Sequence, residues 1–564
     1  MQWAIAAALI CSSTVFTGCS KSDDNQEPVV KPEQPDDNGA NSSSDDIGYI
    51  ECSWNGTEVV KTPKVTTARD MSTLSYSSGS VRNTIKISGF YFISGSFTTD
   101  NYLYVNGWAA IILCDGADLK VSGIYVNNGG TLIIYAQEKG TGHLYAETKY
   151  SDDFCPAIGT YVGDGGKVEI HGGNVDAKGG IRSAGIGGGG SDDEHANLSD
   201  IIIYGGRVYG HSNGGAGIGA GAYDTSVKTN ITIYDGLIEG SGGTDVYKGK
   251  FYGVGIGGGH KASFGSVNIY GGTVTASASD ESAGIGAGEE APNGEGVVNI
   301  YGGTVTAQGG ARGAGIGGGD GRRLNEINIH GGEVYAYAGA DGAGIGGGED
   351  GDSGDINIYG GIVRAYGDRW ADGSSNKGYG AGIGSGQNGN VNTIIIKGGD
   401  VQAYGGMDAA GIGTGEEYGS DINSGTIEIH GGKVWAEGKG YGAGIGAGED
   451  ATFGVLGISG GRVDAHAGSD CGPWSGSIGA YHKDHGADDN CHIGWAGWER
   501  IYIGAGMRLW TYSPNVGSIE TVTNNLPWWN YVHQRPQAAF DVCDHPGYTE
   551  ATCPFCYRET LQLR

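Results

Sequence analysis

Residues 298–321 read VNIYGGTVTAQGGARGAGIGGGDG, and this stretch decides the fold. Apolar and polar residues alternate in VNIY and in TVTA, which is the period of a β-strand and not of a helix. The Gly-Gly pair between the two phrases supplies the positive φ angles that a sharp corner needs. AGIG then follows as a third segment, whose only bulky side chain is Ile316. The stretch therefore predicts three short strands joined by corners.

Near-copies of these phrases recur along the chain, and strands this short cannot form a domain alone. Stacking the copies joins their backbones by hydrogen bonds from one unit to the next, in parallel and in register. The sequence therefore predicts an all-β fold, a right-handed parallel β-helix solenoid of about eleven coils. Ile158 and Ile478 look like degenerate outer members. The clear units are marked by the central isoleucines of the AGIG-type phrases: Ile186, Ile218, Ile256, Ile285, Ile316, Ile345, Ile383, Ile412 and Ile445.

The composition agrees with a folded repeat protein. The chain has 564 residues, of which 115 are Gly and only 12 are Pro, and no strict Gly-X-Y period occurs, so collagen is excluded. Hydrophobic residues make up 38%, which is enough for a core. The formal net charge of −30 disfavours nucleic acid as a partner, because phosphate binding needs a basic surface.

The first residues predict export and anchoring. Residues 1–18 form an uncharged, largely apolar segment that is typical of a signal peptide and too short for a membrane span. FTGC (16–19) resembles a bacterial lipobox and predicts lipidation of Cys19. Residues 19–48 are rich in Pro, Asp, Asn and Ser and predict a flexible tether. The alternative is an ordinary secreted protein with an acidic tail.

The remaining domain boundaries follow from where the repeat begins and ends. We expect N-terminal strands and opening coils over 49–150 and the AGIG-repeat β-helix over 151–480. Residues 481–564 depart from the repeat and predict a Cys/Trp-rich cap over the last coil. No other apolar stretch is long enough to cross a membrane, so contact with a membrane is expected through the lipid anchor only.

The repeat units resemble a known group of proteins. The AGIGGG and I-x-I-x-G-G-x-V-x-A phrases are similar to those of the Gly-rich right-handed β-helix proteins of gut bacteria. SKSDDN (20–25) resembles the export signal of Bacteroidota surface lipoproteins, and residues 89–106 and 110–144 resemble the opening coils of β-helix carbohydrate-binding domains. The resemblance covers roughly 80–480. It implies a cell-surface lipoprotein of the outer membrane that binds carbohydrate.

In a solenoid, equivalent positions of successive coils form columns, and two columns carry outward-facing aromatic residues. One column precedes the Gly-Gly corner, and its stacked rings are candidates to present flat faces to sugars. The alternative is that Tyr suits exposed strands and packs on its own copies. The C-terminal Trp residues either cap the solenoid or form a glycan platform. The candidate sugar-binding residues are Tyr270, Tyr301, Tyr335, Tyr359, Trp435, Trp474, Trp495 and Trp498.

A third column is acidic and lies four residues after the AGIG isoleucine. Carboxylates about 5 Å apart repel one another unless they are neutralised. Ca²⁺ is the natural partner in a secreted protein, and solvated loop acids are the alternative. The candidate calcium ligands are Glu289, Asp320, Glu349, Glu416 and Glu449.

The C-terminal cysteines leave two alternatives open. Cys543, His545, Cys553 and Cys556 form a C-x-H-x7-C-x2-C pattern that suits tetrahedral Zn²⁺. Export favours disulfides instead, and removing Cys11 and Cys19 leaves eight cysteines that disulfides can use in full. Cys471 and Cys491 are a candidate pair. Calcium and zinc are therefore the two candidate cofactors.

These observations favour a non-catalytic surface lipoprotein whose β-helix binds a glycan or adheres to a host surface. One alternative is a glycoside hydrolase or polysaccharide lyase acting on host or dietary glycans. However, hydrolysis needs two carboxylates about 5–10 Å apart, and the outward strand acids Asp176, Glu239 and Asp464 stand in coils that are not adjacent. No serine elbow, HExxH or phosphate loop occurs in a suitable context. A structural spacer is the third reading.

Overall fold

The computed structural model describes most of the chain between residues 44 and 468 and five short strands beyond it. The described ranges are 44–74, 84–148, 154–163, 165–190, 196, 198–223, 225, 228–245, 250–251, 253–368, 378–417, 422–452, 454–468, 478–481, 501–503, 507–512, 520–522 and 537–542. Residues Ser42–Arg564 form one compact unit, to which all strands below belong. No helix among the described residues is long and apolar enough to cross a membrane.

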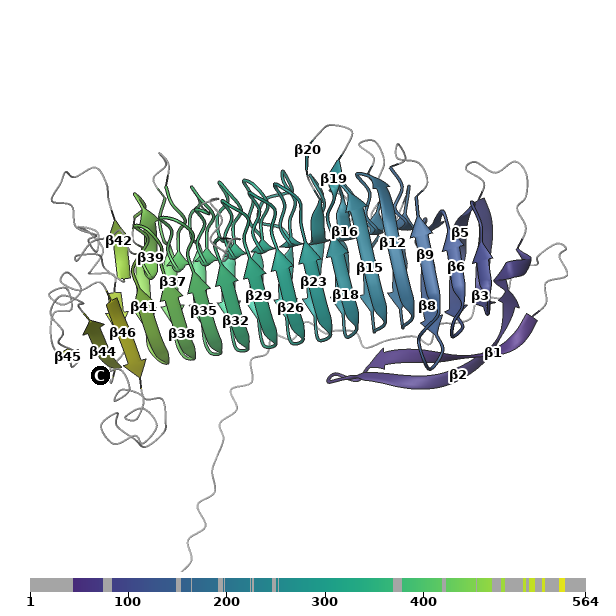
Figure 1. The fold of residues 1–564 in the computed structure, drawn as a ribbon, viewed down its shortest axis with the longest axis horizontal. Helices are drawn as coiled ribbons and strands as arrows, with labels where there is room; N and C mark the ends of the chain where they lie inside the picture. The colour runs from purple at the N-terminus through teal and green to yellow at the C-terminus, as the bar shows by residue number, and fades with distance from the viewer. Residues whose placement is uncertain are drawn as a thin grey trace, which may run out of the picture. The chain divides into compact units, whose positions relative to one another are not determined.

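Three long ladders of strands run from coil to coil, one for each phrase of the repeat (Figure 1). The first ladder contains the VNIY-type strands, and every pairing within it is parallel. Its strands are β3 (Thr84–Ile93), β5 (Tyr102–Leu113), β8 (Thr131–Ala136), β11 (Lys167–Ile170), β14 (Asp200–Ile203), β17 (Thr229–Ile233), β22 (Phe264–Ile269), β25 (Val297–Ile300), β28 (Glu326–Ile329), β31 (Asp355–Ile358), β34 (Thr393–Ile396), β37 (Thr426–Ile429), β40 (Val455–Ile458) and β43 (Ile501–Ile503).

The second ladder contains the TVTA-type strands and is also parallel from β4 to β41. Its strands are β4 (Ser96–Thr98), β6 (Asp118–Val121), β9 (His143–Glu147), β12 (Asn174–Ile181), β15 (Arg207–Asn213), β18 (Leu237–Ser241), β23 (Thr273–Ser277), β26 (Thr304–Gln308), β29 (Glu333–Tyr337), β32 (Ile362–Tyr366), β35 (Asp400–Tyr404), β38 (Lys433–Glu437) and β41 (Arg462–His466). Beyond β41 the order continues through antiparallel strands β46 (Gln537–Val542), β44 (Met507–Tyr512) and β45 (Glu520–Val522).

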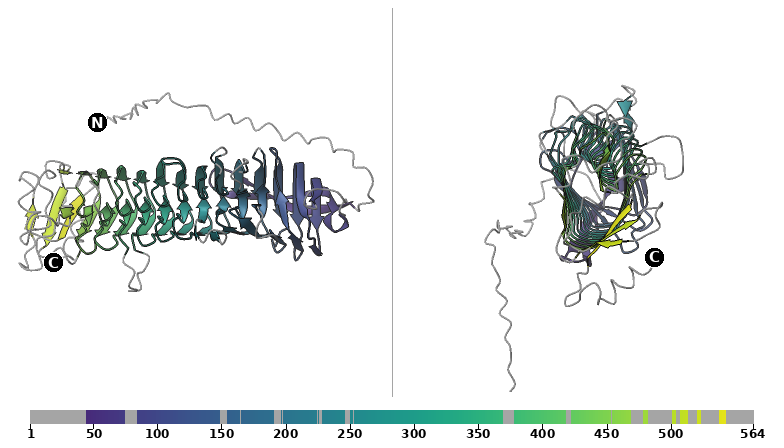
Figure 2. Two further views of the ribbon diagram at one scale, coloured as in Figure 1. Left: turned by 90° about the horizontal axis from the view of Figure 1, so that it is seen from above. Right: turned by 90° about the vertical axis from the view of Figure 1, so that its left-hand side faces the viewer.

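The third ladder contains the AGIG-type strands. Its strands are β7 (Gly123–Tyr125), β10 (Ile158–Thr160), β13 (Ile186–Gly188), β16 (Ala216–Gly219), β21 (Val254–Gly257), β24 (Ile285–Gly286), β27 (Ile316–Gly317), β30 (Ile345–Gly346), β33 (Ile383–Gly384), β36 (Ile412–Gly413), β39 (Ile445–Glu449) and β42 (Ile478–Tyr481). Seen end-on, the strands of successive coils lie over one another (Figure 2). The prediction of a parallel β-helix is confirmed, whereas its right-handedness stays a prediction.

The predicted register and the predicted core are both confirmed. Ile269 pairs with Ile300, Ala276 with Ala307 and Ile285 with Ile316, so equivalent residues of neighbouring coils are direct partners. All six side chains have no exposed surface. The strands of the first and second ladders therefore bury two apolar columns each, and those of the third ladder bury the column of isoleucines.

Glycine is required at two places in each coil that carries the Gly-Gly and AGIG phrases. Gly303, the second residue of the Gly-Gly corner, has a φ of +84°, which L side chains rarely adopt. Gly317 of AGIG has a φ of +146°, and a Cβ on it would lie 1.8 Å from the carbonyl oxygen of Gly346 in the next coil. The AGIG phrase recurs because the backbones of neighbouring coils touch at these glycines from β10 to β42.

An N-terminal hairpin precedes the coils, and the repeat did not predict it. β1 (Ser44–Trp54) and β2 (Val59–Asp70) pair antiparallel, and a short 3-10 helix η1 (Met71–Thr73) follows. β1 begins inside the segment 19–48 that was predicted as a tether. It contacts the first ladder where Ile50 pairs with Ala136. A short hairpin projects from one loop, and its strands β19 (Thr244–Asp245) and β20 (Lys250–Phe251) have two residues each.

Candidate functional site

The aromatic residues that precede the Gly-Gly corners form a continuous stack, which we call the ring ladder. Neighbouring rings have centroids 4.5 to 5.1 Å apart and planes inclined by 3 to 27°. Each inner ring therefore lies face to face with the rings above and below it. The ring ladder consists of His171, Tyr204, Tyr234, Tyr270, Tyr301, His330 and Tyr359.

The exposure of the rings bears on the two predictions for the column. Tyr301 is 40% exposed and Tyr359 is 39% exposed. However, the Tyr270 and His330 rings each cover one face of Tyr301. The His330 ring and the Lys397 side chain cover the faces of Tyr359. The Lys397 ammonium lies 4.6 Å from the centroid of the Tyr359 ring. Sugar stacking needs a free ring face. Because the inner rings of the ladder pack on one another, they offer only ring edges and hydroxyls.

The β1–β2 hairpin covers the N-terminal half of the ring ladder. Trp54 stacks on Tyr234 with centroids 4.9 Å apart and also touches the Tyr270 ring at 5.3 Å. The Cys52 backbone N–H donates to Nδ1 of His171 over 2.9 Å. Tyr270, a predicted sugar-binding residue, is therefore a packing surface for the hairpin.

A second group of aromatic side chains lies on the outer face of the second ladder, where the rings occupy two adjacent columns. Tyr337, Tyr366 and Tyr404 are in-register partners and stack at 5.0 and 5.1 Å. Trp435 stacks on His466 at 3.9 Å. The equivalent positions of the earlier strands β23 and β26 carry Thr, Ser and Gln. We define the outer patch as Tyr335, Tyr337, Tyr366, Tyr404, Trp435 and His466.

A groove lies at one edge of the outer patch. The in-register partner of Tyr404 in the next coil is Glu437, so the tyrosine stack ends at Tyr404. The Lys439 ammonium lies 2.8 Å from Oδ2 of Asp368, and the indole N–H of Trp435 donates to Oε2 of Glu437 over 3.1 Å. The groove is lined by Tyr366, Asp368, Tyr404, Gly405, Glu437, Gly438 and Lys439.

The groove combines an aromatic wall with charged hydrogen-bonding groups. Burial raises the pKa of the Tyr366 and Tyr404 phenols, and for Tyr404 the Glu437 carboxylate adds to the effect. Both hydroxyls therefore keep their protons and remain donors. The Tyr404 hydroxyl donates to Oε1 of Gln402 over 3.1 Å. Sequence reasoning named Tyr335 and Trp435 in this region but missed Tyr366 and Tyr404, although their two-residue offset from the named column was visible.

The acidic column is brought together in two clusters. Carboxylate oxygens of Glu289 and Asp320 lie within 4.8 Å of each other and of Glu281. Glu416 and Glu449 form the second cluster with Asp408. Gln387 stands at the equivalent position between Glu349 and Glu416, and its Nε2 donates to Glu416 over 2.8 Å.

Arg312 supplies the positive charge at the centre of the acidic column. Its guanidinium lies 3.0 Å from the Glu349 carboxylate, 3.2 Å from that of Asp320 and 3.9 Å from that of Glu281. Burial nevertheless raises the pKa of Glu349 to about 7 and that of Asp341 to about 6, against the opposing effect of Arg312. A single arginine thus pairs with Asp320 and Glu349, two of the five candidate calcium ligands.

The remaining predicted sites lie outside the described residues. These are the lipidation site Cys19, the tryptophans Trp474, Trp495 and Trp498, the candidate disulfide Cys471 and Cys491, and the candidate zinc ligands Cys543, His545, Cys553 and Cys556. Cys52 and Cys114 are buried thiols without a disulfide. Whether the C-terminal cysteines form disulfides or bind zinc stays a prediction.

Comparisons with known proteins bear on the fold. Seven segments match the beta helix repeat family: 168–190, 267–289, 298–320, 327–349, 356–387, 394–416 and 427–449. No curated protein and no solved structure matches the chain. Each matched segment begins in a strand of the first ladder and extends through the AGIG strand of the same coil. Together with the in-register parallel ladders, these matches identify the chain as a parallel β-helix repeat protein.

Proposed function

We propose that the protein binds carbohydrate at the outer patch and does not cleave it. The observation that carries this proposal is the groove beside Tyr404, the ring at which the tyrosine stack ends. Sugar rings pack their C–H faces on aromatic rings, while their hydroxyls need donors and acceptors placed around that surface. Asp368, Glu437 and Lys439 supply such groups within the same groove.

The contacts of the two groove carboxylates favour binding over hydrolysis. Asp368 is held by the Lys439 ammonium, and Glu437 is held by the Trp435 indole. A glycosidase needs one carboxyl group to donate a proton and a second to attack or to activate water. Here both carboxylates are fixed as hydrogen-bond acceptors beside an aromatic wall, which is an arrangement for recognition.

The proposal includes the location of the protein at the cell surface. A lipid on Cys19 would anchor the chain at the outer membrane and display the coils to glycans or to a host surface. Incorporation of labelled fatty acid into the wild-type chain, and its loss in Cys19→Ala, is the expected result.

The binding proposal predicts a strong effect for Tyr404→Ala. Truncating a central aromatic residue of a binding surface costs on the order of 1.4 kcal/mol or more, so affinity for the bound glycan falls about tenfold or more. The measurement is a screen of mucin, plant and microbial glycans, followed by titration of the best ligand.

Tyr301→Ala is the matched control, because it removes a tyrosine of the ring ladder whose faces are covered. It is expected to leave the affinity unchanged. Equal loss in both variants would contradict the placement of the site. Released oligosaccharide would show a hydrolase or lyase instead, and the absence of both binding and release would favour a spacer.

A further inference from the structure

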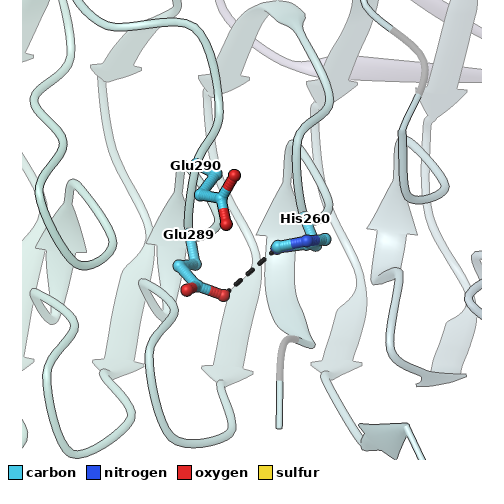
Figure 3. Close-up of side chains that lie close together, drawn as sticks. All are labelled: His260, Glu289 and Glu290. Atoms are coloured by element: carbon cyan, nitrogen blue, oxygen red, sulfur yellow. Dashed lines mark ion pairs between the residues drawn. The ribbon is translucent and has the colours of Figure 1, made fainter. Parts of the chain in front are cut away.

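Outside the groove, three side chains of mixed chemistry converge from the turns of two successive coils. His260 stands four residues after Ile256, and Glu289 stands four residues after Ile285, so the two occupy the same column in successive coils. Nδ1 of His260 lies 3.2 Å from Oε2 of Glu289. Glu290 follows in the chain, and Figure 3 shows its carboxylate beside both side chains. One ligand atom from each of the three residues lies within 4.8 Å of the other two.

The backbone fixes the two inner ligands before any ion arrives. The Lys261 N–H donates to the Glu289 carbonyl over 2.9 Å, and the Tyr223 N–H donates to the His260 carbonyl over 2.7 Å. The His260 side chain is only 3% exposed and meets the Tyr223 ring edge-on at 5.1 Å. The backbone segments that carry the imidazole and the carboxylate are thus held in place by coil-to-coil pairing.

The donor set selects the class of ion. A tetrahedral ion with bonds of about 2.1 Å places its ligand atoms about 3.4 Å apart, close to the separation of His260 and Glu289. Imidazole nitrogen suits Zn²⁺ and its neighbours in the first transition row, whereas Ca²⁺ takes six or more oxygens. This cluster therefore differs in kind from the all-carboxylate clusters of the same column.

Lys261 is the cation paired with a proposed ligand, and the charges of Arg182 and Arg322 also act on His260 and Glu290. The Lys261 ammonium is 2.7 Å from Oε2 of Glu290, and the side chains are 39% and 48% exposed. Exposed ion pairs contribute little to stability, so Glu290 can exchange the ammonium for a metal ion at small cost.

We propose that His260, Glu289 and Glu290 form a binding site for a divalent transition-metal ion of the zinc class. The three protein ligands leave a fourth position to water or to an external ligand. This site is independent of carbohydrate binding, and it is distinct from the C-terminal cysteine pattern.

The test is a Co²⁺ titration of the full chain, followed by visible absorption and by the number of ions bound. Cobalt reports its ligands directly, since thiolate ligands add a near-ultraviolet charge-transfer band that nitrogen and oxygen ligands lack. A Cys553→Ser, Cys556→Ser background removes the candidate C-terminal site. In that background we expect one bound ion with no thiolate band, which Zn²⁺ displaces and an equal concentration of Ca²⁺ does not.

Three variants decide the assignment. His260→Gln is expected to lose the ion, and Glu290→Gln to weaken binding by at least about tenfold, since even outer-shell partners of a metal contribute that much. Glu290 is exposed, so its substitution leaves folding intact. Glu349→Gln, in the same column but held by Arg312, is the control and should bind as the parent does. Unchanged stoichiometry and affinity in His260→Gln and Glu290→Gln would overturn the proposal, as would displacement by Ca²⁺.

Discussion

Gly317→Ala is expected to destroy the cooperative unfolding transition of the coils around it. The new Cβ would lie 1.8 Å from the Gly346 carbonyl oxygen, and the φ of +146° is itself unfavourable for alanine. The contact is with backbone that is pinned in the next coil, so neither partner can move without breaking the third ladder. A loss above about 4 kcal/mol is expected, in the range reserved for backbone clashes and core defects.

Two other glycines separate the clash from the backbone strain. Gly321 has a φ of +65° with no atom within 4 Å of its Cβ position, so Gly321→Ala should cost only about 1–2 kcal/mol for the left-handed conformation. Gly95 has neither a positive φ nor a neighbour within 4 Å, and Gly95→Ala should be nearly neutral. Thermal melts by circular dichroism measure all three. If the Gly317→Ala protein had the same melting temperature as the Gly95→Ala protein, the close approach of the coils would be refuted.

Ile316→Ala is the second substitution with a large expected effect. The Ile316 side chain has no exposed surface and fills the core column between Ile285 and Ile345. Removing it leaves a cavity, at a cost of about 2–5 kcal/mol. Because each coil is stabilised by its neighbours, the defect should lower the stability of adjacent coils as well.

Ile362→Ala is the matched control. Ile362 has the same side chain on the outer face of the second ladder and is 38% exposed. Its loss should cost less than about 1 kcal/mol, as for most surface positions. Urea midpoints compare the two variants. Equal midpoints would mean that the inside and outside faces have been assigned wrongly.

The fold could be predicted from the repeat because the same pattern of strand residues and glycine corners recurs in each coil. Period-two alternation assigned Ile269 and Val274 to the core, and the Gly-Gly pairs marked the corners. The β1–β2 hairpin has no counterpart elsewhere in the chain. Its position depends on the contact of Trp54 with Tyr234, residues 180 apart in sequence, which no local pattern encodes.

The site was predictable as columns but not as contacts. The sequence placed tyrosines above one another, yet whether a ring shows its face or its edge depends on rotamers chosen against the neighbouring coils. For the same reason, the ion pairs of Arg312 with Asp320 and Glu349 could not be predicted. The hydrogen bonds from Asn299 to Asn268 over 2.8 Å and from Asn328 to Asn299 over 3.0 Å were not predicted either. Composition alone gives no reason to pair these side chains.

Register is the assumption on which every column rests, and cysteine cross-linking measures it directly. Thr275 and Thr306 are in-register partners on the outer face of the second ladder. Neighbouring parallel strands are about 4.8 Å apart, so cysteines at these two positions can form a disulfide. Cysteines at Thr275 and Gln308 lie about 8 Å apart, too far for a disulfide. Mild oxidation and peptide mass mapping should show the Thr275→Cys, Thr306→Cys link in high yield and no link in the Thr275→Cys, Gln308→Cys protein. A link in the second protein, or none in the first, would contradict the in-register parallel β-helix.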